Sequence, residues 1–236
     1  MKRLVLGTDQ ILLAPDGTIR VGTSSSYVRI GLDGLVMPKA SSDGIKIDPI
    51  SPAFGWRDIL GPIRTRGVGA TDPNDATYQS GVKQYQFAVN DEAWIEYHIP
   101  HDYAAGTDIH LHYHWSHNSA IVTGGSVTFG YKITYSKGHN QAAFPSPVTG
   151  TFVANASTTQ YQHIVSETQI SADSPSGSQI DTDNIEPDGL VLCRIYLSAN
   201  NITSSGAVPD PFIHEVDIHY QSTGIPTKNK VPGFYT

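Results

Sequence analysis

Apolar and polar residues alternate with a period of two along several stretches of this 236-residue chain. In 126–135 every odd-numbered residue is apolar or aromatic, and in 212–220 the apolar Val216, Ile218 and Tyr220 alternate with polar residues. Successive side chains on a strand point to opposite faces, so this pattern predicts strands with one buried and one polar face. No amphipathic helical pattern of any length competes with it. The chain is therefore predicted to be all-β.

Eight stretches of this kind follow one another from residue 82 onward, separated by segments rich in turn-forming residues. They are 82–89, 92–99, 107–115, 126–135, 148–154, 159–169, 189–198 and 212–221. Eight antiparallel strands with a half-buried pattern most often form a two-sheet sandwich of the jelly-roll type, and less often an up-and-down barrel. We predict an eight-stranded antiparallel jelly-roll sandwich over residues 62–222.

Residues 1–61 have a different sequence pattern. Asp-Gly turn signals at 16–17, 33–34 and 43–44 each precede a short β-like run, at 18–21, 35–37 and 45–47 respectively. The apolar residues are too few to close a core, and an isolated two-stranded ribbon is only marginally stable in water. We therefore predict an extended N-terminal β-ribbon arm that needs a partner surface, with interaction residues Phe54, Trp56, Ile59 and Leu60.

The last residues, 223–236, are predicted to form a short extended tail. Pro226 and Pro232 prevent it from continuing as a strand. Phe234 and Tyr235 offer terminal aromatic side chains that can anchor the tail on a neighbouring subunit. The alternative is an ordinary frayed terminus.

Charge and composition exclude several classes of partner. The formal net charge is -7 and there is no long run of Lys or Arg, which argues against direct contact with nucleic acid. No apolar stretch approaches the roughly 20 residues that span a bilayer, and the apolar part of the N-terminus is too short for a secretory signal. We expect a soluble protein made in a cytoplasm, with Cys193 as a small buried residue.

The segment 108–115 carries three histidines, His110, His112 and His114, at alternate positions, so they should project from one face of one strand. Imidazole nitrogens on such a face can bind zinc or a similar metal, if a fourth ligand and acceptors for the other ring nitrogens exist. Candidates for the fourth ligand are His98, His101, His117, Glu215 and His219. The alternative, which we predict, is that the histidines pack against neighbouring strands or a partner chain, with no metal and no cofactor.

The motifs of common enzyme classes are missing from the sequence. There is no nucleophile elbow, no phosphate-binding loop and no dinucleotide fingerprint. The acidic loop from Asp181 to Asp188 has enough oxygen ligands for calcium, but an acidic surface loop is the commoner case. Carboxylate pairs on strands, such as Glu92 with Glu96, are usually solvated and do not indicate glycoside hydrolysis. The protein is therefore predicted not to be an enzyme.

The sequences of four segments, 54–61, 98–103, 106–110 and 137–141, resemble those of virion structural proteins of tailed bacteriophages, in particular jelly-roll capsid decoration (cement) proteins. This resemblance implies a homotrimer seated on the capsid exterior after synthesis in the host cytoplasm. It also implies contact with the major capsid protein and an N-terminal arm exchanged with neighbours.

Two other functions stay open. A tail fibre or adhesin subunit would bind host-surface carbohydrate through loop residues such as Trp115, His117 or Tyr103. A metal-dependent enzyme would use the face of His110, His112 and His114. The position on head or tail and the copy number are not fixed by the sequence.

Overall fold

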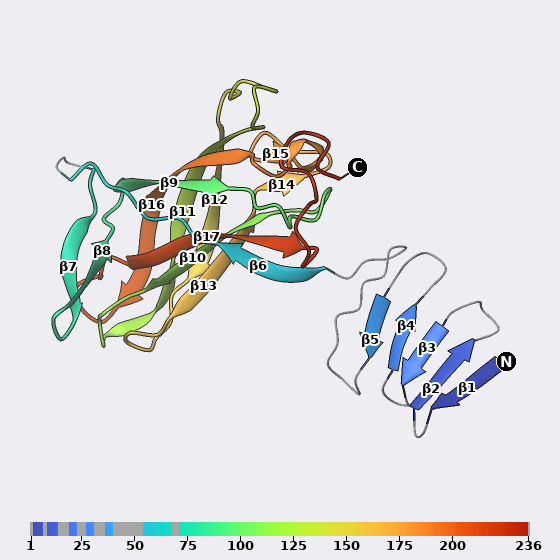
Figure 1. Ribbon diagram of the computed structural model, residues 1–236. Coiled ribbons are helices and arrows are strands. Elements are labelled where there is room, and N and C mark those ends of the chain that lie inside the picture. Colours follow the sequence, from blue (N-terminus) through green and yellow to red (C-terminus); the bar gives the residue numbers. More distant parts are fainter. Residues whose placement is uncertain are drawn as a thin grey trace. The chain divides into compact units, whose positions relative to one another are not determined.

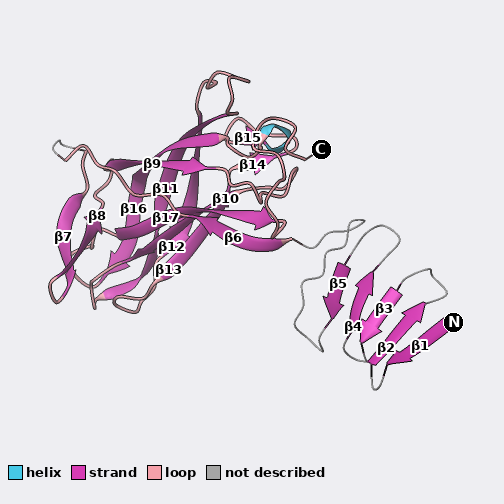
Figure 2. Ribbon diagram, in the orientation of Figure 1, coloured by secondary structure: helices cyan, strands magenta, loops and turns pink. Residues whose placement is uncertain are grey.

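The computed structural model describes residues 2–6, 9–13, 19–22, 27–30, 36–39, 54–67 and 71–235, and divides the chain into two compact units, Met1–Phe54 and Gly55–Thr236. Strands dominate both units (Figures 1 and 2). In the part of the chain that the structure describes, the one helix is the short 3-10 turn η1 (Thr182–Asn184). No helix there is long and apolar enough to cross a membrane.

The first unit contains a five-stranded antiparallel sheet in which each strand pairs with the next. Its strands are β1 (Lys2–Leu6), β2 (Asp9–Leu13), β3 (Ile19–Gly22), β4 (Tyr27–Ile30) and β5 (Val36–Lys39). The runs predicted at 18–21 and 35–37 correspond to β3 and β5. The three Asp-Gly turns and the run at 45–47 lie outside the described residues. The described strands thus join into one sheet instead of separate ribbons.

The second unit is a sandwich of two antiparallel sheets, with a small parallel pair beside them. The larger sheet contains β6 (Gly55–Ile59), β7 (Asn74–Gln79), β8 (Val82–Gln86), β10 (His110–Ser116), β13 (Ile164–Gln169) and β17 (Phe212–Ser222). The four-stranded sheet contains β9 (Glu92–His98), β11 (Val122–Ser136), β12 (Val148–Asn155) and β16 (Leu190–Ser204). The parallel pair is β14 (Ser171–Ala172) with β15 (Ile180–Asp181).

The eight predicted strands correspond to β8 to β13, β16 and β17. The larger sheet has the order β13-β10-β17-β8 and the smaller one β12-β11-β16-β9. Numbered from one to eight in chain order, the strands of the larger sheet are the sixth, third, eighth and first. Those of the smaller sheet are the fifth, fourth, seventh and second. This is the strand order of two Greek keys in a jelly roll. The predicted all-β antiparallel sandwich is therefore confirmed, but its two sheets contain ten strands instead of eight, because β6 and β7 extend the larger sheet.

The boundary between the units lies before the predicted one near Gly61. Strand β6 pairs with β17, from Ile59 opposite Ile218 to Gly55 opposite Ser222, so residues 55–61 belong to the sandwich and not to an arm. Strand β8 pairs only with Phe212 and Ile213 of β17, and β6 pairs with the last residues of the same edge, from Ile218 to Ser222. Ile59 packs against the core, whereas Trp56 and Leu60 are exposed.

The core lies between the two sheets and is rich in aromatic rings. The odd-numbered residues of 127–135 are all buried, as the alternation predicts, and Cys193 is buried among them. The rings of Tyr113 and Phe129 stack at 4.8 Å, and Trp115 meets Phe129 edge-on at 5.4 Å. Aromatic pairs in these arrangements add to the stabilisation from burial.

The C-terminal tail differs from the prediction, because it folds back onto its own sandwich. Phe234 is 4% exposed and packs against the rings of His101 and His139. The hydroxyl of Tyr235 donates to the carbonyl of Tyr103 at 3.3 Å. Phe234 is thus occupied within its own chain and is not an exposed anchor for a neighbour. Burial of a large apolar ring against a nearby surface outweighs the cost of ordering a short tail.

Candidate functional site

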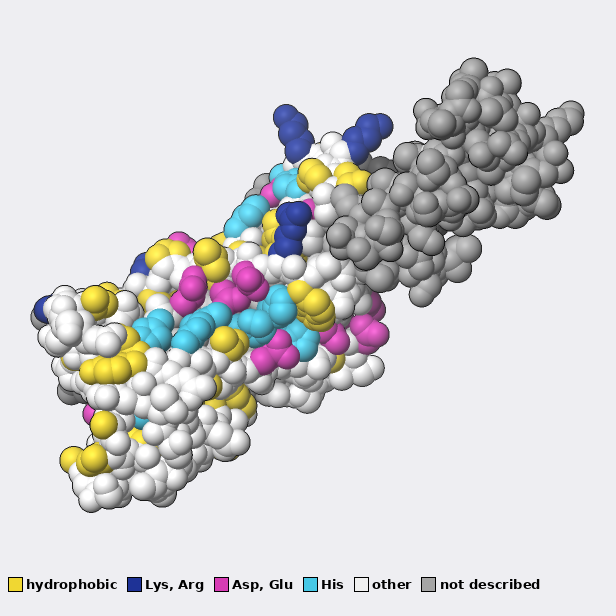
Figure 3. Space-filling model, turned by 90° about the horizontal axis from the view of Figure 1, so that it is seen from below, with side chains coloured by type: hydrophobic (Ala, Val, Ile, Leu, Met, Phe, Trp, Pro, Cys, Tyr) yellow, Lys and Arg dark blue, Asp and Glu magenta, His cyan; other side chains and the backbone are white. Residues whose placement is uncertain are grey.

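The alternation on β10 places its three histidines on the outer face of the larger sheet, as predicted. The intervening Leu111 and Tyr113 are fully buried in the core. Figure 3 shows the resulting row of histidines, flanked by carboxylates. Because the rings are side by side on a rigid sheet, the face presents an ordered set of nitrogen and oxygen atoms.

Strand pairing decides which residues flank the row. His112 lies between Glu167 of β13 and Asp217 of β17. His110 is opposite His219, which in turn is opposite Asp58 of β6. The exposed ring of Trp56 covers the end of the row, with its centroid 4.6 Å from that of His219. The predicted interaction residue Trp56 therefore belongs to the histidine face.

One half of the face is organised around Glu167. Its Oε2 lies 2.5 Å from Nε2 of His112, and that nitrogen is 2.9 Å from Nδ1 of His219. Burial alone would raise the pKa of Glu167, but the hydrogen bond to His112 and the charge of His110 outweigh it and hold this pKa below its usual value. For His110 itself, burial lowers the pKa, against the opposing effect of Glu167.

The other half of the face is organised around Asp217, which is 1% exposed although it points away from the core. Nε2 of His114 lies 2.9 Å from Oδ1 and Nδ1 of His112 lies 3.7 Å from Oδ2. These are ion-pair distances, but neither contact has the geometry of a hydrogen bond, so both carboxylate oxygens lack a donor among the described residues. Burial raises the pKa of Asp217, against the opposing effect of both histidines. Such a buried, unsatisfied carboxylate is costly and uncommon in folded proteins.

Two sets of three side chains on this face bring nitrogen and oxygen atoms within 4.8 Å of one another. They are Asp58, His112 and His219, and His112, His114 and Asp217. Histidine nitrogens with a carboxylate oxygen form the ligand set of zinc and related metals. Among the additional ligands predicted from the sequence, His219 joins a set, whereas His98, His101, His117 and Glu215 do not.

Three neighbours of the histidines were not predicted from the sequence: Asp217, Glu167 and Asp58. Asp217 and His219 are two residues apart on a predicted strand, so their side chains point to the same face. This spacing could have indicated that Asp217 lies beside the histidines. Glu167 is 55 residues from His112 and gives no local signal. Its place depends on which strands are neighbours.

A second histidine cluster surrounds Asp188. Its carboxylate oxygens lie 3.2 Å from Nε2 of His98, 3.1 Å from that of His101 and 2.8 Å from that of His139. The hydrogen bond to His139 and the charges of the other two histidines hold the pKa of Asp188 below its usual value, against a smaller effect of burial. The cluster joins β9, the loop after it and the loop after β11, and the tail packs on it through Phe234.

The acidic loop that contains Asp188 does not gather its carboxylates around one point. Asp181 caps η1 by accepting from the backbone N–H of Asp183. Glu186 pairs with Lys137 at 3.5 Å, and Asp188 faces the three histidines. The calcium site considered for this loop would need these oxygens to converge. The observed pairing accounts for them as structural contacts instead.

The residues predicted for carbohydrate contact are not accessible. Trp115 and Tyr103 are fully buried and His117 is 1% exposed, with its Nε2 at 2.8 Å from the carbonyl of Ser157. The prediction of a sugar platform on these three residues is wrong. Trp115 and Tyr103 sit at core positions, and their aromatic character reflects packing.

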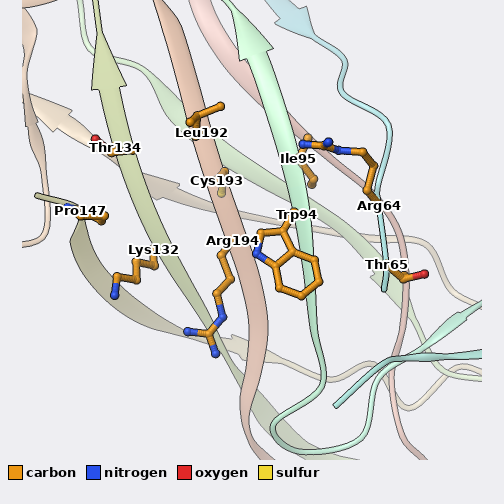
Figure 4. A pocket seen from close by; sticks show the side chains of 10 residues that line it. All are labelled: Arg64, Thr65, Trp94, Ile95, Lys132, Thr134, Pro147, Leu192, Cys193 and Arg194. Atoms are coloured by element: carbon orange, nitrogen blue, oxygen red, sulfur yellow. The ribbon is translucent and has the colours of Figure 1, made fainter. Parts of the chain in front are cut away.

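A hollow of about 540 Å³ lies on the four-stranded sheet (Figure 4). Its arginines already have partners: Arg194 pairs with Glu92, and Arg64 pairs with Glu96 at 3.3 Å. The hollow is lined by Arg64, Thr65, Trp94, Ile95, Lys132, Thr134, Pro147, Leu192, Cys193 and Arg194. Since the arginine charges are compensated, the hollow gives weaker grounds for a binding site than the histidine face.

No protein-family profile and no curated protein matches this chain. Among solved structures, it is similar to the CBM22-1–GH10 modules of Clostridium thermocellum xylanase 10B complexed with xylohexaose, at 11% identity and a TM-score of 0.27. It is also similar to Arthrobacter globiformis T6 isomalto-dextranase complexed with panose, at 12% identity and a TM-score of 0.31. The matches cover 70% and 89% of this chain but only 26% and 36% of those chains. Similarity at this level carries no argument about function.

Proposed function

We propose that this chain is a non-enzymatic structural protein of a tailed-phage virion, acting as a trimeric capsid decoration protein that stabilises the head by bridging capsomers. The sequence resemblance given above suggests this class. The jelly-roll strand order of the second unit is compatible with it. In this proposal the protein is a homotrimer that lies on the capsid exterior and contacts the major capsid protein.

The observation that carries the proposal is the construction of the first unit. Its described strands form one sheet, and a single sheet must pack an apolar face against another layer before it is stable. Ile19 and Val21, on the same face of β3, are each 39% exposed. An assembly partner that covers this sheet would bury such residues, as obligate interfaces do.

Removal of residues 1–54 should leave a folded sandwich that no longer forms trimers or docks on heads. The cut precedes β6, so the edge of β17 keeps its partner. The oligomeric state is measured by size-exclusion chromatography with light scattering, and docking by co-sedimentation with heads that lack the protein. Removal of residues 228–236 is the matched control, and it should leave the trimer intact. A chain without residues 1–54 that still forms the same oligomer and docks equally well would contradict the role of the first unit.

Heads assembled without the protein should release DNA at a lower temperature than complete heads. The reason is that a bridging protein adds buried interface between capsomers and so opposes the pressure of packaged DNA. The measurement is DNA release against temperature, with and without added protein. Equally robust heads together with failed adsorption to host cells would instead support the alternative, a tail fibre or adhesin subunit that binds host carbohydrate.

A further inference from the structure

We infer that the outer face of the larger sheet binds one divalent transition-metal ion of the zinc class through Nδ1 of His112, Nε2 of His114 and the carboxylate of Asp217. This inference goes beyond the proposed function and does not depend on it. It replaces the sequence-based expectation that these histidines only pack.

The spacing of the three donor groups fits such an ion. Bonds of about 2.0–2.2 Å in a tetrahedral site separate neighbouring ligand atoms by about 3.3 Å. The contacts of Asp217 with His114 and His112, at 2.9 Å and 3.7 Å, bracket that distance. All three donor atoms lie within 4.8 Å of one another. Three protein ligands would leave a fourth position for water or for a partner's side chain.

The state of Asp217 points independently to a cation. The residue is 1% exposed, and its carboxylate faces the two rings and lacks a hydrogen-bond donor among the described residues. Neutral imidazoles that serve as metal ligands do not compensate a buried negative charge, whereas a bound divalent ion does. The ion would therefore account for a charge that the described protein groups leave unsatisfied.

Both ligand histidines also have the outer partners that metal sites use. The second nitrogen of His112 contacts Glu167 at 2.5 Å, and the second nitrogen of His114 contacts Nε2 of His163 at 2.9 Å. Acceptors at these positions fix the tautomer and the orientation of a ligating ring. Both rings are thus already held on the side opposite Asp217.

The other set of donors, Asp58, His112 and His219, competes for the same His112. The side chain of Asp58 is 54% exposed, against 2% for that of Asp217. An exposed carboxylate is satisfied by water and gains less from an ion than a buried one. The ion should therefore occupy the Asp217 side of His112.

The test uses the full chain, freed of metal with a chelator and titrated with Zn²⁺ by calorimetry and with Co²⁺ by visible absorption. We expect one ion per chain and the d–d bands of a Co²⁺ site with nitrogen and oxygen ligands. Asp217→Asn and His114→Ala should each weaken binding by on the order of 100-fold or more. His110→Ala is the matched control, because it removes a histidine of the same strand and face that is in neither donor set, and it should bind as the original chain does.

Several results would overturn the assignment. One is the absence of Zn²⁺ and Co²⁺ binding by the original chain. Another is binding that survives both Asp217→Asn and His114→Ala but is lost in His219→Ala, which would place the ion on the Asp58 side. Binding that is lost in His98→Ala and in no other variant would place the ion at Asp188. Circular dichroism of every variant establishes that it is folded, and the two ligand variants provide independent readings if one of them does not fold.

Discussion

Trp115→Ala should lower the free energy of unfolding by about 3–5 kcal/mol. The indole ring is fully buried between the sheets, meets Phe129 edge-on and donates from Nε1 to Oγ of Ser166 at 3.0 Å. Truncation to alanine removes this packing, leaves a cavity and deprives the Ser166 hydroxyl of its donor. Urea unfolding followed by circular dichroism, at one protein concentration, measures the change through the midpoint at an unchanged slope.

Trp56→Ala is the matched control for this prediction. It removes the same side chain from a site that is 48% exposed, where the ring rests on His110 and His219. The expected loss is about 1 kcal/mol, because the contact is partial and the site is open to water. Equal losses in the two variants would mean that Trp115 does not lie in the core between the sheets.

Asp102→Asn should cost about 3 kcal/mol at neutral pH. The buried carboxylate of Asp102 accepts from Nη1 of Arg57 at 2.8 Å, from the hydroxyl of Tyr220 at 2.9 Å and from that of Ser222 at 2.6 Å. It therefore ties the loop after β9 to both β6 and β17. The amide has one acceptor oxygen fewer and no charge, so it cannot satisfy all three donors.

The same change should remove a pH dependence. Burial alone would raise the pKa of Asp102, but the hydrogen bonds from Ser222 and Tyr220 and the charge of Arg57 outweigh it and hold the pKa below its usual value. A lowered pKa in the folded state contributes stability above the unfolded pKa of about 3.9, and that stability is lost as the pH falls through the folded pKa. The difference between the original chain and Asp102→Asn should thus shrink below about pH 4.

Glu96→Gln is the control for Asp102→Asn. Glu96 also pairs with an arginine, Arg64, at 3.3 Å, but its side chain is 49% exposed. Solvent screens such a pair, so the expected loss is less than about 0.5 kcal/mol. A loss in Asp102→Asn as small as this, or a difference that persists unchanged to pH 3, would show that the Asp102 network does not hold the two strands.

Eight of the ten strands in the two sheets of the sandwich could be predicted from the sequence, because alternation with a period of two is a local property of the chain; β6 and β7 were not predicted. Whether a side chain faces the core follows from its parity on the strand, which is why the burial of Tyr113 and the outward position of His112 were both predictable. The start of the sandwich was misplaced because β6 is a short strand without strong alternation, and its assignment depends on the free edge of β17. Phe234 was misjudged for a similar reason, since its binding surface is formed by His101 and His139 from distant loops.

The histidine face shows the same division between local and long-range information. That three histidines share one face of one strand follows from their spacing in the sequence alone. The positions of Glu167 and His219 beside them depend on the packed fold, because these residues are separated from His112 by 55 and 107 residues. The burial of Asp217 without a donor among the described residues also depends on the packed fold. The two-residue period of a strand fixes the direction of each side chain. The neighbours and the burial of that side chain depend on strand order and register, and these are selected by the packing of the whole core.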